Sequence, residues 1–524
     1  MRVTNDGPVT GETMKVDELP LWDLITWRAT ATPDAVFAVD ETGAEMTFEV
    51  FRDRCERVAG ALTRLGITRD VVVAWMLPTW TEALVLAGGL ARLGAVQVPL
   101  LPSLRERELS FILAQSRAAH LFVPGVWRNY DYPALAMMVT EELPGVGVTV
   151  VDRQLPEVAG ADLPAWESVA PSPGEDPVRW IFFTSGTTAH PKGTLHTDRT
   201  VAAAAHRLNR RFETTATDRN ALVFPVTHIG GISWLMGGLL DGYRQIMVET
   251  FRPEDSCAVL RREGVTIAGS GPAFWMVYVA EQRRCRDEKA FPQLRALVGG
   301  GAAKPPTLNA EVAEVLGVPL VTGYGSSECP GVAHSGVSDS EAVRLADGYA
   351  LDDCAIRIID AAGAVLLPGK AGEIVVRGPM LFRGYLDPAD NEGAFDDDGW
   401  FRTGDVGTLD EHGVLRVTGR VKDIIIRKGE NISAKEVEDV LYLHSAVADV
   451  AAIALPDLER GELCCAVVVL ADGSETLGLD DLIDHCSRHR LARHKFPERL
   501  ELIDRLPRNA TGKVLKQELR QRYS

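Results

Sequence analysis

The sequence lacks the features that mark several specialised classes of protein. Its eight cysteines are scattered through 524 residues without the paired spacing of a metal site, so neither a zinc module nor a disulfide framework is expected. The longest apolar stretch, residues 83–101, is interrupted by Arg92 and several glycines, which excludes a membrane span there. Residues 1–16 lack the basic and apolar segments of a secretory signal. We therefore expect a cytoplasmic protein with reduced thiols.

Positive charge is also scarce. The chain has 55 Lys and Arg against 73 Asp and Glu, a formal net charge of −18. This balance argues against nucleic acid or an anionic membrane as the main partner, because both attract basic surfaces. An anionic small molecule would need a locally positive pocket. Apolar content of 46% is ordinary for a globular protein, and a chain of this length is expected to form two or more packed units.

Apolar segments typical of strands alternate with amphipathic helical segments from the start of the chain. The predicted strands are 35–39, 71–76, 96–100, 180–183, 221–226 and 297–300. The predicted helices are 48–65, 82–93 and 197–211. This alternation predicts an α/β fold with two mostly parallel sheets, each covered by helices.

The predicted secondary-structure pattern changes twice towards the C-terminus. From Glu373 onward, short strand segments separated by turn signals predict a small β-rich unit. After Gly419 the pattern becomes α+β, and the adjacent Cys464 and Cys465 fall in an apolar run typical of a core. We place the domain boundary at 420–422, which divides the chain into a large domain, 1–421, and a small one, 422–524.

A loop rich in small hydroxyl residues follows the predicted strand 180–183. Its sequence is Thr184-Ser185-Gly186-Thr187-Thr188-Ala189-His190-Pro191-Lys192-Gly193. Backbone N–H groups and hydroxyls of such a loop can surround phosphate oxygens, while Lys192 supplies positive charge. It is not a Walker loop, because the glycine at 193 follows the lysine instead of preceding it. The loop predicts a phosphate-binding site.

Further clusters of glycine and polar residues follow along the chain. His228 precedes two glycines, and Gly299-Gly300-Gly301-Ala302-Ala303 ends a predicted strand, where glycine permits close approach of a ligand. In Gly323-Tyr324-Gly325-Ser326-Ser327-Glu328, the tyrosine offers a flat face to a purine, and Glu328 is the hard oxygen ligand that Mg²⁺ takes beside phosphates. Asp405 could accept the two hydroxyls of a ribose. These groups predict a nucleotide site.

The order of these clusters, together with Arg420, Lys422, Gly429 and the Pro-Arg-Asn-Ala-Thr-Gly-Lys513 segment, resembles the adenylate-forming superfamily. This superfamily comprises acyl-CoA synthetases, luciferases and peptide-synthetase adenylation domains. The chain is most similar to acyl-CoA synthetases of the medium-chain or cyclohexanecarboxylate type. Ala189 departs from the pattern, since the family usually has glycine there.

The resemblance implies an N-terminal AMP-binding domain over 1–421, a mobile C-terminal domain over 422–524, and a role for each matching residue. The implied phosphate contacts are Thr184, Ser185, Gly186, Thr187, Thr188 and Lys192, with Ser327 at the α-phosphate and Glu328 on Mg²⁺. The implied nucleoside contacts are Gly301, Ala302, Ala303, Tyr324, Gly325, Asp405 and Arg420. The implied acyl pocket has His228, Trp234, Gly299 and Gly300. Lys422 would be the hinge, Gly429 would face the pantetheine arm, and Lys513 would be the catalytic lysine of the second domain.

The implied activity is an ATP-dependent acyl-CoA synthetase that uses Mg²⁺ and CoA and activates a hydrophobic acid as acyl-AMP. One alternative is a ligase that loads a carrier protein's phosphopantetheine thiol, since residues 129–132 faintly resemble aryl-acid enzymes. An oxidative luciferase-like reaction is disfavoured, because Ile426 replaces the expected lysine. An inactive nucleotide-binding scaffold is disfavoured by the retained charged residues. Trp234, Leu235 and Met236 could wall the acyl pocket or belong to the core.

Overall fold

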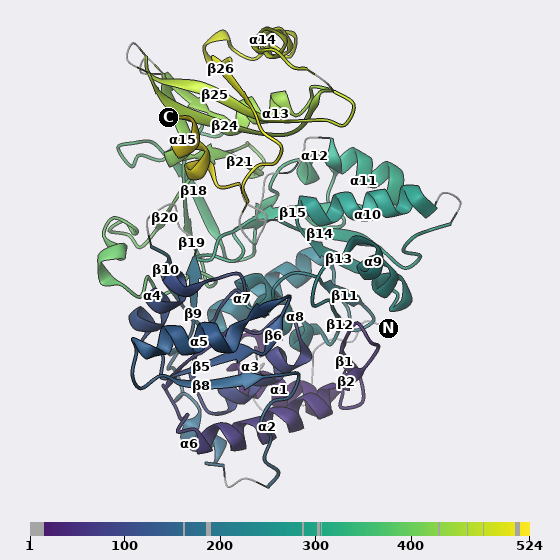
Figure 1. Ribbon diagram of the computed structural model, residues 1–524, viewed down its shortest axis with the longest axis vertical. Helices are drawn as coiled ribbons and strands as arrows, with labels where there is room; N and C mark the ends of the chain where they lie inside the picture. The colour runs from purple at the N-terminus through teal and green to yellow at the C-terminus, as the bar shows by residue number, and fades with distance from the viewer. Residues whose placement is uncertain are drawn as a thin grey trace.

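The architecture is taken from a computed structural model of the chain (Figure 1). The structure describes residues 15–160, 163–184, 190–285, 288–300, 304, 307–427, 430–457, 460–474, 476–508 and 514–524.

The larger of two mostly parallel sheets has nine strands in the described residues. Their order is β17 (Tyr349–Ala350), β16 (Ala333–His334), β15 (Leu320–Tyr324), β14 (Ala296–Gly300), β13 (Ile267–Ser270), β11 (Arg219–Leu222), β12 (Arg244–Met247), β1 (Val36–Val39) and β2 (Glu45–Thr47). The strands from β15 to β1 run parallel, and antiparallel pairs close both edges. The carboxyl ends of β13, β14 and β15 therefore meet along one edge of the sheet.

The second sheet has six strands in the described residues. Their order is β10 (Lys192–Thr197), β9 (Val178–Thr184), β4 (Val96–Pro99), β3 (Val72–Trp75), β5 (His120–Pro124) and β8 (Gly147–Val151). All neighbouring pairs are parallel except β9 with β10. A short hairpin, β6 (Val126–Trp127) with β7 (Tyr130–Asp131), lies beside this sheet. The two sheets confirm the predicted α/β class.

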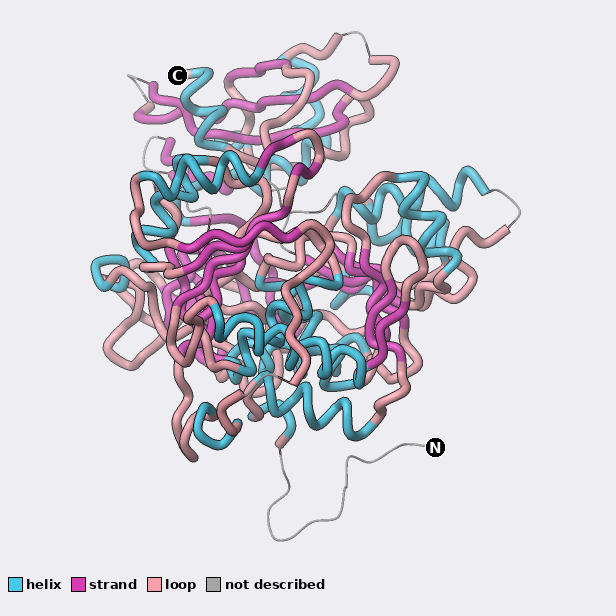
Figure 2. Tube along the Cα trace, turned by 60° about the horizontal axis from the view of Figure 1, so that its bottom comes forward, coloured by secondary structure: helices cyan, strands magenta, loops and turns pink. Residues whose placement is uncertain are grey.

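Helices fill the space between the sheets and cover their outer faces, as the two groups of strands with helices between them show in Figure 2. One buried cluster joins both sheets to the central helices α1 (Leu21–Ala31), α2 (Phe48–Arg64), α3 (Thr81–Arg92), α7 (Asp198–Phe212) and α8 (Ile229–Asp241). The outer helices are α4 (Glu106–Ser116) and α5 (Tyr132–Glu141) on the smaller sheet, and α9 (Pro253–Arg262), α10 (Pro272–Cys285) and α11 (Leu308–Leu316) on the larger. The short helices are α6 (Trp166–Val169) and α12 (Glu341–Arg344).

Helix α3 explains the long apolar stretch seen in the sequence. Every residue from Glu82 to Arg92 is buried, because the helix is surrounded by other elements on all sides. A central helix of a large globular unit is apolar all round for this reason. Within the described ranges, no helix combines the length and apolar character needed to cross a bilayer.

The β-rich unit is an antiparallel sheet that begins earlier than the sequence predicted. Its strands are β18 (Ala355–Ile359), β19 (Gly372–Arg377), β20 (Phe401–Leu409) and β21 (Leu415–Arg420). The prediction started the unit at Glu373 and was wrong to omit β18. Ile358 pairs with Ile374 across β18 and β19, and both side chains are buried. This cross-strand burial makes β18 part of the sheet.

The C-terminal unit follows β21 after the single 3₁₀ turn Val421–Asp423 and lies at the top of Figure 1. Its elements are β22 (Ile424–Arg427), β23 (Glu430–Ser433), α13 (Ala434–Leu441), β24 (Val447–Asp457), β25 (Gly461–Leu470), α14 (Leu479–Arg488), β26 (Arg499–Leu502) and α15 (Lys516–Tyr523). Cys464 and Cys465 lie fully buried in β25, so the expectation that they are core residues is confirmed. This unit is the predicted small α+β domain.

One predicted strand in the larger sheet is displaced. The sequence predicted a strand over 221–226, but β11 ends at Leu222. Pro225 has no N–H group to continue the ladder. The Thr79 hydroxyl donates to the Phe224 carbonyl at 2.9 Å and accepts from the Val226 N–H at 3.1 Å. The segment therefore turns away from the sheet and leads to His228.

Helices α2 and α3 approach so closely that glycine is required between them, which gives a test of the packing. A Cβ on Gly88 would lie 2.3 Å from the Cys55 Sγ. We expect Gly88→Ala to lower the free energy of unfolding by about 1–3 kcal/mol, the usual cost of overpacking. The unfolding midpoint in urea, followed by tryptophan fluorescence, measures this change.

The matched control for that substitution is Gly125→Ala, because the nearest atom to its added Cβ would be the Asp152 Oδ1 at an ordinary 3.6 Å. Its midpoint should stay close to that of the unchanged chain. Equal midpoints for both variants would contradict the close packing of α2 on α3.

Candidate active site

The predicted phosphate loop lies between two antiparallel strands. Thr184 ends β9, Lys192 begins β10, and the two residues face each other in the hairpin. The Thr184 hydroxyl donates to the Lys192 carbonyl at 3.4 Å. Four of the predicted phosphate contacts, Ser185, Gly186, Thr187 and Thr188, lie outside the described residues, as does Ala189. The described stem holds Lys192 at the base of the loop.

Lys192 and Glu328 meet on two sides of one tyrosine. The Lys192 Nζ lies 5.0 Å from the centroid of the Tyr385 ring, and the Tyr385 hydroxyl donates to the Glu328 Oε1 at 2.9 Å. Lys192 also forms an ion pair with Asp390, with 2.7 Å between Nζ and Oδ1. Burial and the neighbouring Glu328 charge raise the pKa of the Tyr385 phenol, so the hydroxyl remains a donor. The predicted phosphate lysine and the predicted metal carboxylate therefore share one location.

Glu328 fits a magnesium site of the kind that substrate phosphates complete. An ionised carboxylate offers about four lone-pair positions, so the phenol on Oε1 leaves room for a cation. Within the described part of the chain, no group of three or more His, Cys, Asp or Glu could hold a metal ion. Mg²⁺ usually binds one or two carboxylates together with phosphates and water, so Glu328 could serve as its protein ligand.

A buried histidine that the sequence analysis missed fixes the segment carrying Ser327 and Glu328. The His196 Nε2 donates to the Ser327 carbonyl across 2.7 Å, and its Nδ1 lies 2.9 Å from the Thr200 hydroxyl. Burial lowers the pKa of His196 to about 4, so the ring is neutral at physiological pH. The only sequence signal was a polar residue in a buried strand, which is weak because many such residues are structural.

The predicted nucleoside residues come together at the junction of β15, β20 and β21. Asp405 and Arg420 face each other in the β20–β21 ladder, with 2.7 Å between the Asp405 Oδ1 and the Arg420 Nε. The Tyr324 hydroxyl donates to the Asp405 Oδ2 at 2.5 Å. Asp405 is 4% exposed, and burial with the Asp405 charge raises the pKa of Tyr324. Gly325 follows immediately, and a Cβ there would lie 3.0 Å from the Pro330 carbonyl oxygen.

His228 caps the N-terminus of α8. Its Nδ1 accepts the Gly230 N–H at 3.0 Å, and burial lowers the pKa of the ring to about 4. A neutral ring whose Nδ1 is an acceptor carries its proton on Nε2. His228 is therefore a neutral hydrogen-bond donor through Nε2, a suitable group to contact an oxygen of a ligand.

The carboxyl end of β14 depends on glycine. Gly299 has φ +144°, and a Cβ there would lie 2.2 Å from the Ser270 carbonyl oxygen. A Cβ on Gly300 would lie 2.5 Å from the Gly323 carbonyl oxygen. The backbones of β13, β14 and β15 are thus packed closely at the edge where the site lies. The next three predicted residues, Gly301, Ala302 and Ala303, lie outside the described residues.

The sequence left open whether the helix residues after His228 line the acyl pocket or belong to the core, and the structure separates them. Leu235 and Met236 are fully buried in the core between the sheets. Trp234 is half-buried, stacks on Phe212 with 5.9 Å between ring centroids, and lies against Gly269 at the end of β13. Trp234 therefore remains a candidate wall of the acyl pocket, whereas its two neighbours are core residues.

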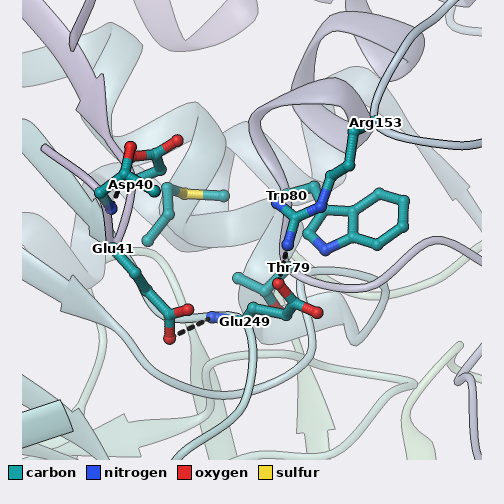
Figure 3. Close-up of a pocket in the computed structure, with 8 residues that line it drawn as sticks. Asp40, Glu41, Thr79, Trp80, Arg153 and Glu249 are labelled. Carbon is teal, nitrogen blue, oxygen red and sulfur yellow. Dashed lines mark hydrogen bonds and ion pairs between the residues drawn. The ribbon is translucent and has the colours of Figure 1, made fainter. Parts of the chain in front are cut away.

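A cavity of about 40 Å³ lies beside Thr79, the residue that hydrogen-bonds the segment before His228 (Figure 3). Its lining residues are Asp40, Glu41, Thr42, Thr79, Trp80, Arg153, Met247 and Glu249. Glu249 pairs with Arg153 and accepts the Trp127 indole N–H, and the Glu41 carboxylate accepts the Glu249 N–H at 3.2 Å. Arg153 also lies over the Trp80 ring, next to Thr79 in the chain, with 4.4 Å to the ring centroid. Because these charges are satisfied within the protein, the cluster is best explained as structural.

The remaining predicted residues belong to the C-terminal unit and its connection. Lys422 is exposed in the 3₁₀ turn between β21 and β22. Gly429 and Lys513 lie outside the described residues. The connection is held close to the large domain, because the Ser433 hydroxyl donates to the Thr418 carbonyl on β21.

Comparison with known proteins places this geometry in context. The sequence matches the AMP-binding enzyme family over residues 25–386 and the AMP-binding enzyme C-terminal domain over residues 436–513. It is 32% identical over 504 residues to the medium-chain fatty-acid–CoA ligase of Escherichia coli, covering 94% of this chain and 88% of that protein. It is 33% identical over 515 residues to the long-chain-fatty-acid–CoA ligase FadD13 of Mycobacterium tuberculosis, covering 96% and 98%.

A solved structure shows the same similarity in three dimensions. The O-succinylbenzoate coenzyme A synthetase (MenE) of Bacillus subtilis, in complex with ATP and a magnesium ion, superposes with a TM-score of 0.82 and 28% identity. The match covers 96% of this chain and 99% of that one. The similarity therefore extends over both units.

The burial of His228 predicts a distinct titration. Its ring should take a proton only near pH 4, whereas the unfolded chain takes it near pH 6.5. Stability contributed by the neutral ring is thus constant above pH 6.5 and falls as the pH drops towards 4. The ring signals in an NMR pH titration, assigned with a His228→Asn variant, measure this. A midpoint between pH 6 and 7 would contradict the burial of the ring.

Proposed function

Since the chain belongs to the AMP-binding enzyme family, we propose that it is an ATP-dependent acyl-CoA synthetase that activates a hydrophobic carboxylic acid as acyl-AMP and transfers the acyl group to CoA. The observation that supports this most directly is that Lys192 and Glu328 both contact Tyr385. Glu328 also lies only four residues after Tyr324 in the chain. A lysine and a carboxylate able to bind a metal, both in contact with one side chain, suit the phosphates of a nucleotide whose ribose would lie at Asp405.

In the first proposed step, a carboxylate oxygen of the acid attacks the α-phosphorus of ATP, and pyrophosphate leaves with the electrons of the broken P–O bond. Lys192 offsets phosphate charge, and Glu328 would hold Mg²⁺, which supplies further charge neutralisation when bound. The neutral Nε2–H of His228 orients the carboxylate without removing the charge that makes it a nucleophile. Positioning and charge neutralisation account for the chemistry, so no protein nucleophile is needed.

In the second step, the thiol sulfur attacks the acyl carbon and AMP leaves. We propose that the domain formed by residues 422–524 turns about Lys422 between the steps, taking Lys513 away from the phosphates and bringing Gly429 to the pantetheine arm. A hinge at Lys422 is compatible with its exposed position between two separate sheets. We also place the reaction in the cytoplasm, where the eight free cysteines stay reduced.

The proposed acid is hydrophobic. Phe224 packs edge-on against the His228 ring, and Trp234 is a half-buried aromatic side chain further along α8. In the segment that suggested an aryl-acid ligase with a carrier protein, two residues have structural roles. The Tyr132 hydroxyl donates to the Pro102 carbonyl and the Asp131 side chain caps α5, both in the packing of the smaller sheet.

The function is tested by incubating the protein with ATP, Mg²⁺ and a panel of short, medium, alicyclic and aromatic acids, with and without CoA. We expect acyl-AMP without CoA and acyl-CoA with it, detected by mass spectrometry. Acyl-AMP that never becomes acyl-CoA would favour the carrier-protein alternative, and neither product with any acid would favour an inactive scaffold.

The role of Lys513 predicts a separation of the two half-reactions. We expect Lys513→Ala to slow formation of acyl-AMP by 100-fold or more, on the order of the loss of one charge-stabilising group. Thioester formation from supplied acyl-AMP should remain near the unchanged rate. Single-turnover assays of each half measure this, with Lys495→Ala, a surface lysine paired with Glu436, as control. An equal fall in both halves would contradict the proposed role.

A further inference from the structure

The segment between β19 and β20 contacts Lys192 and Glu328, the two charged groups proposed to bind the metal–nucleotide complex. Tyr385 contacts Lys192 through its ring and Glu328 through its hydroxyl. Asp390, five residues further on, holds the Lys192 ammonium at 2.7 Å. Sequence analysis did not single out this segment.

Backbone pairing explains why this segment meets Lys192. The Leu386 N–H donates to the Gly193 carbonyl at 2.8 Å, and the Leu195 N–H donates to the Gly384 carbonyl at 3.0 Å. The chain at 384–386 therefore pairs with β10 in an antiparallel bridge between Tyr385 and Thr194, and β10 begins with Lys192. The register of this pairing brings Tyr385 and the following turn beside the lysine.

The turn that carries Asp390 is closed by side chains on both sides. Asn391 accepts the Tyr385 N–H at 2.8 Å and donates to the Tyr385 carbonyl at 3.1 Å. Asp387 caps the 3₁₀ turn Pro388–Asn391 by accepting the Ala389 N–H at 3.0 Å. These bonds fix Asp390 relative to Tyr385, so the ion pair with Lys192 is set by a closed loop rather than by a free side chain.

The ion pair is placed where it can be exchanged. The side chains of Lys192 and Asp390 are 26% and 28% exposed, and pairs that reach solvent contribute little to stability. A triphosphate carries more negative charge than one carboxylate and forms stronger charge-assisted hydrogen bonds to an ammonium. Phosphate oxygens can therefore displace Asp390 from Lys192.

We infer that Asp390 is a positioning residue that holds Lys192 in the nucleotide-free protein, competes with the phosphates of ATP for it, and takes it back as pyrophosphate leaves. The inference rests on the proposed function. Asp390 thus weakens ATP binding and speeds pyrophosphate release, while Tyr385 keeps the lysine and Glu328 close together throughout the exchange.

Calorimetric titration of the full chain with ATP and Mg²⁺ tests the competition. We expect Asp390→Asn to bind ATP about two- to fivefold more tightly, the worth of one partly exposed ion pair. Adenosine, which has no phosphate, should bind both proteins equally. Asp390→Glu, which restores the charge, should return ATP affinity towards the unchanged value.

The matched control is Asp397→Asn, which removes the same charge from an exposed position in the same connection. Its ATP affinity should not change. In steady-state assays, Asp390→Asn should lower the KM for ATP and the inhibition constant for pyrophosphate by a similar factor, without raising kcat. If Asp390 had a purely structural role, its substitution would not tighten the binding of both ATP and pyrophosphate while leaving adenosine binding unchanged.

The outcomes separate this inference from the function on which it rests. If the unchanged chain binds ATP and Asp390→Asn binds it no more tightly, the inference is wrong and the proposed function stands. If Asp397→Asn tightens ATP binding as much as Asp390→Asn does, general charge explains the effect and the inference is also wrong. A chain that does not bind ATP contradicts both.

Discussion

The pairing of β10 with the chain at 384–386 is the contact on which the arrangement of the site depends. β10 is the last strand of the smaller sheet, whereas residues 384–386 belong to the connection between β19 and β20. Three backbone hydrogen bonds, from the Leu386, Leu195 and Arg383 N–H groups to the Gly193, Gly384 and Leu195 carbonyls, join β10 to this connection. Because a strand ladder allows only discrete registers, this joint fixes Lys192 relative to Tyr385 and, through the Tyr385 hydroxyl, relative to Glu328.

Desolvation determines the chemistry of the histidines around this joint. Burial lowers the pKa of His196 and His228 to about 4, so both rings are neutral and each donates through one nitrogen. His196 uses its proton to hold the Ser327 carbonyl, while His228 keeps its proton available at the end of α8. The same physical effect therefore produces a structural histidine and a candidate ligand-binding one. The difference lies in which acceptor is near Nε2.

The charged groups of the proposed nucleotide site are each paired with another protein group in this structure. Asp405 is held by Tyr324 and Arg420, Glu328 by Tyr385, and Lys192 by Asp390. Unpaired charge in a half-buried site is costly, so internal partners stabilise the ligand-free protein. They also mean that ligand binding is an exchange of partners, and its strength depends on the pairs that are given up.

The sequence by itself determined the alternating α/β order and the membership of most clusters, because apolar periodicity and glycine-rich turns are local properties. It did not determine where β11 ends, since that depends on Thr79, far away in the sequence. It also could not identify His196, Tyr385 or Asp390 as neighbours of the site. Their relevance arises from strand register and burial between segments far apart in the chain, and such contacts exist only once the tertiary structure has formed.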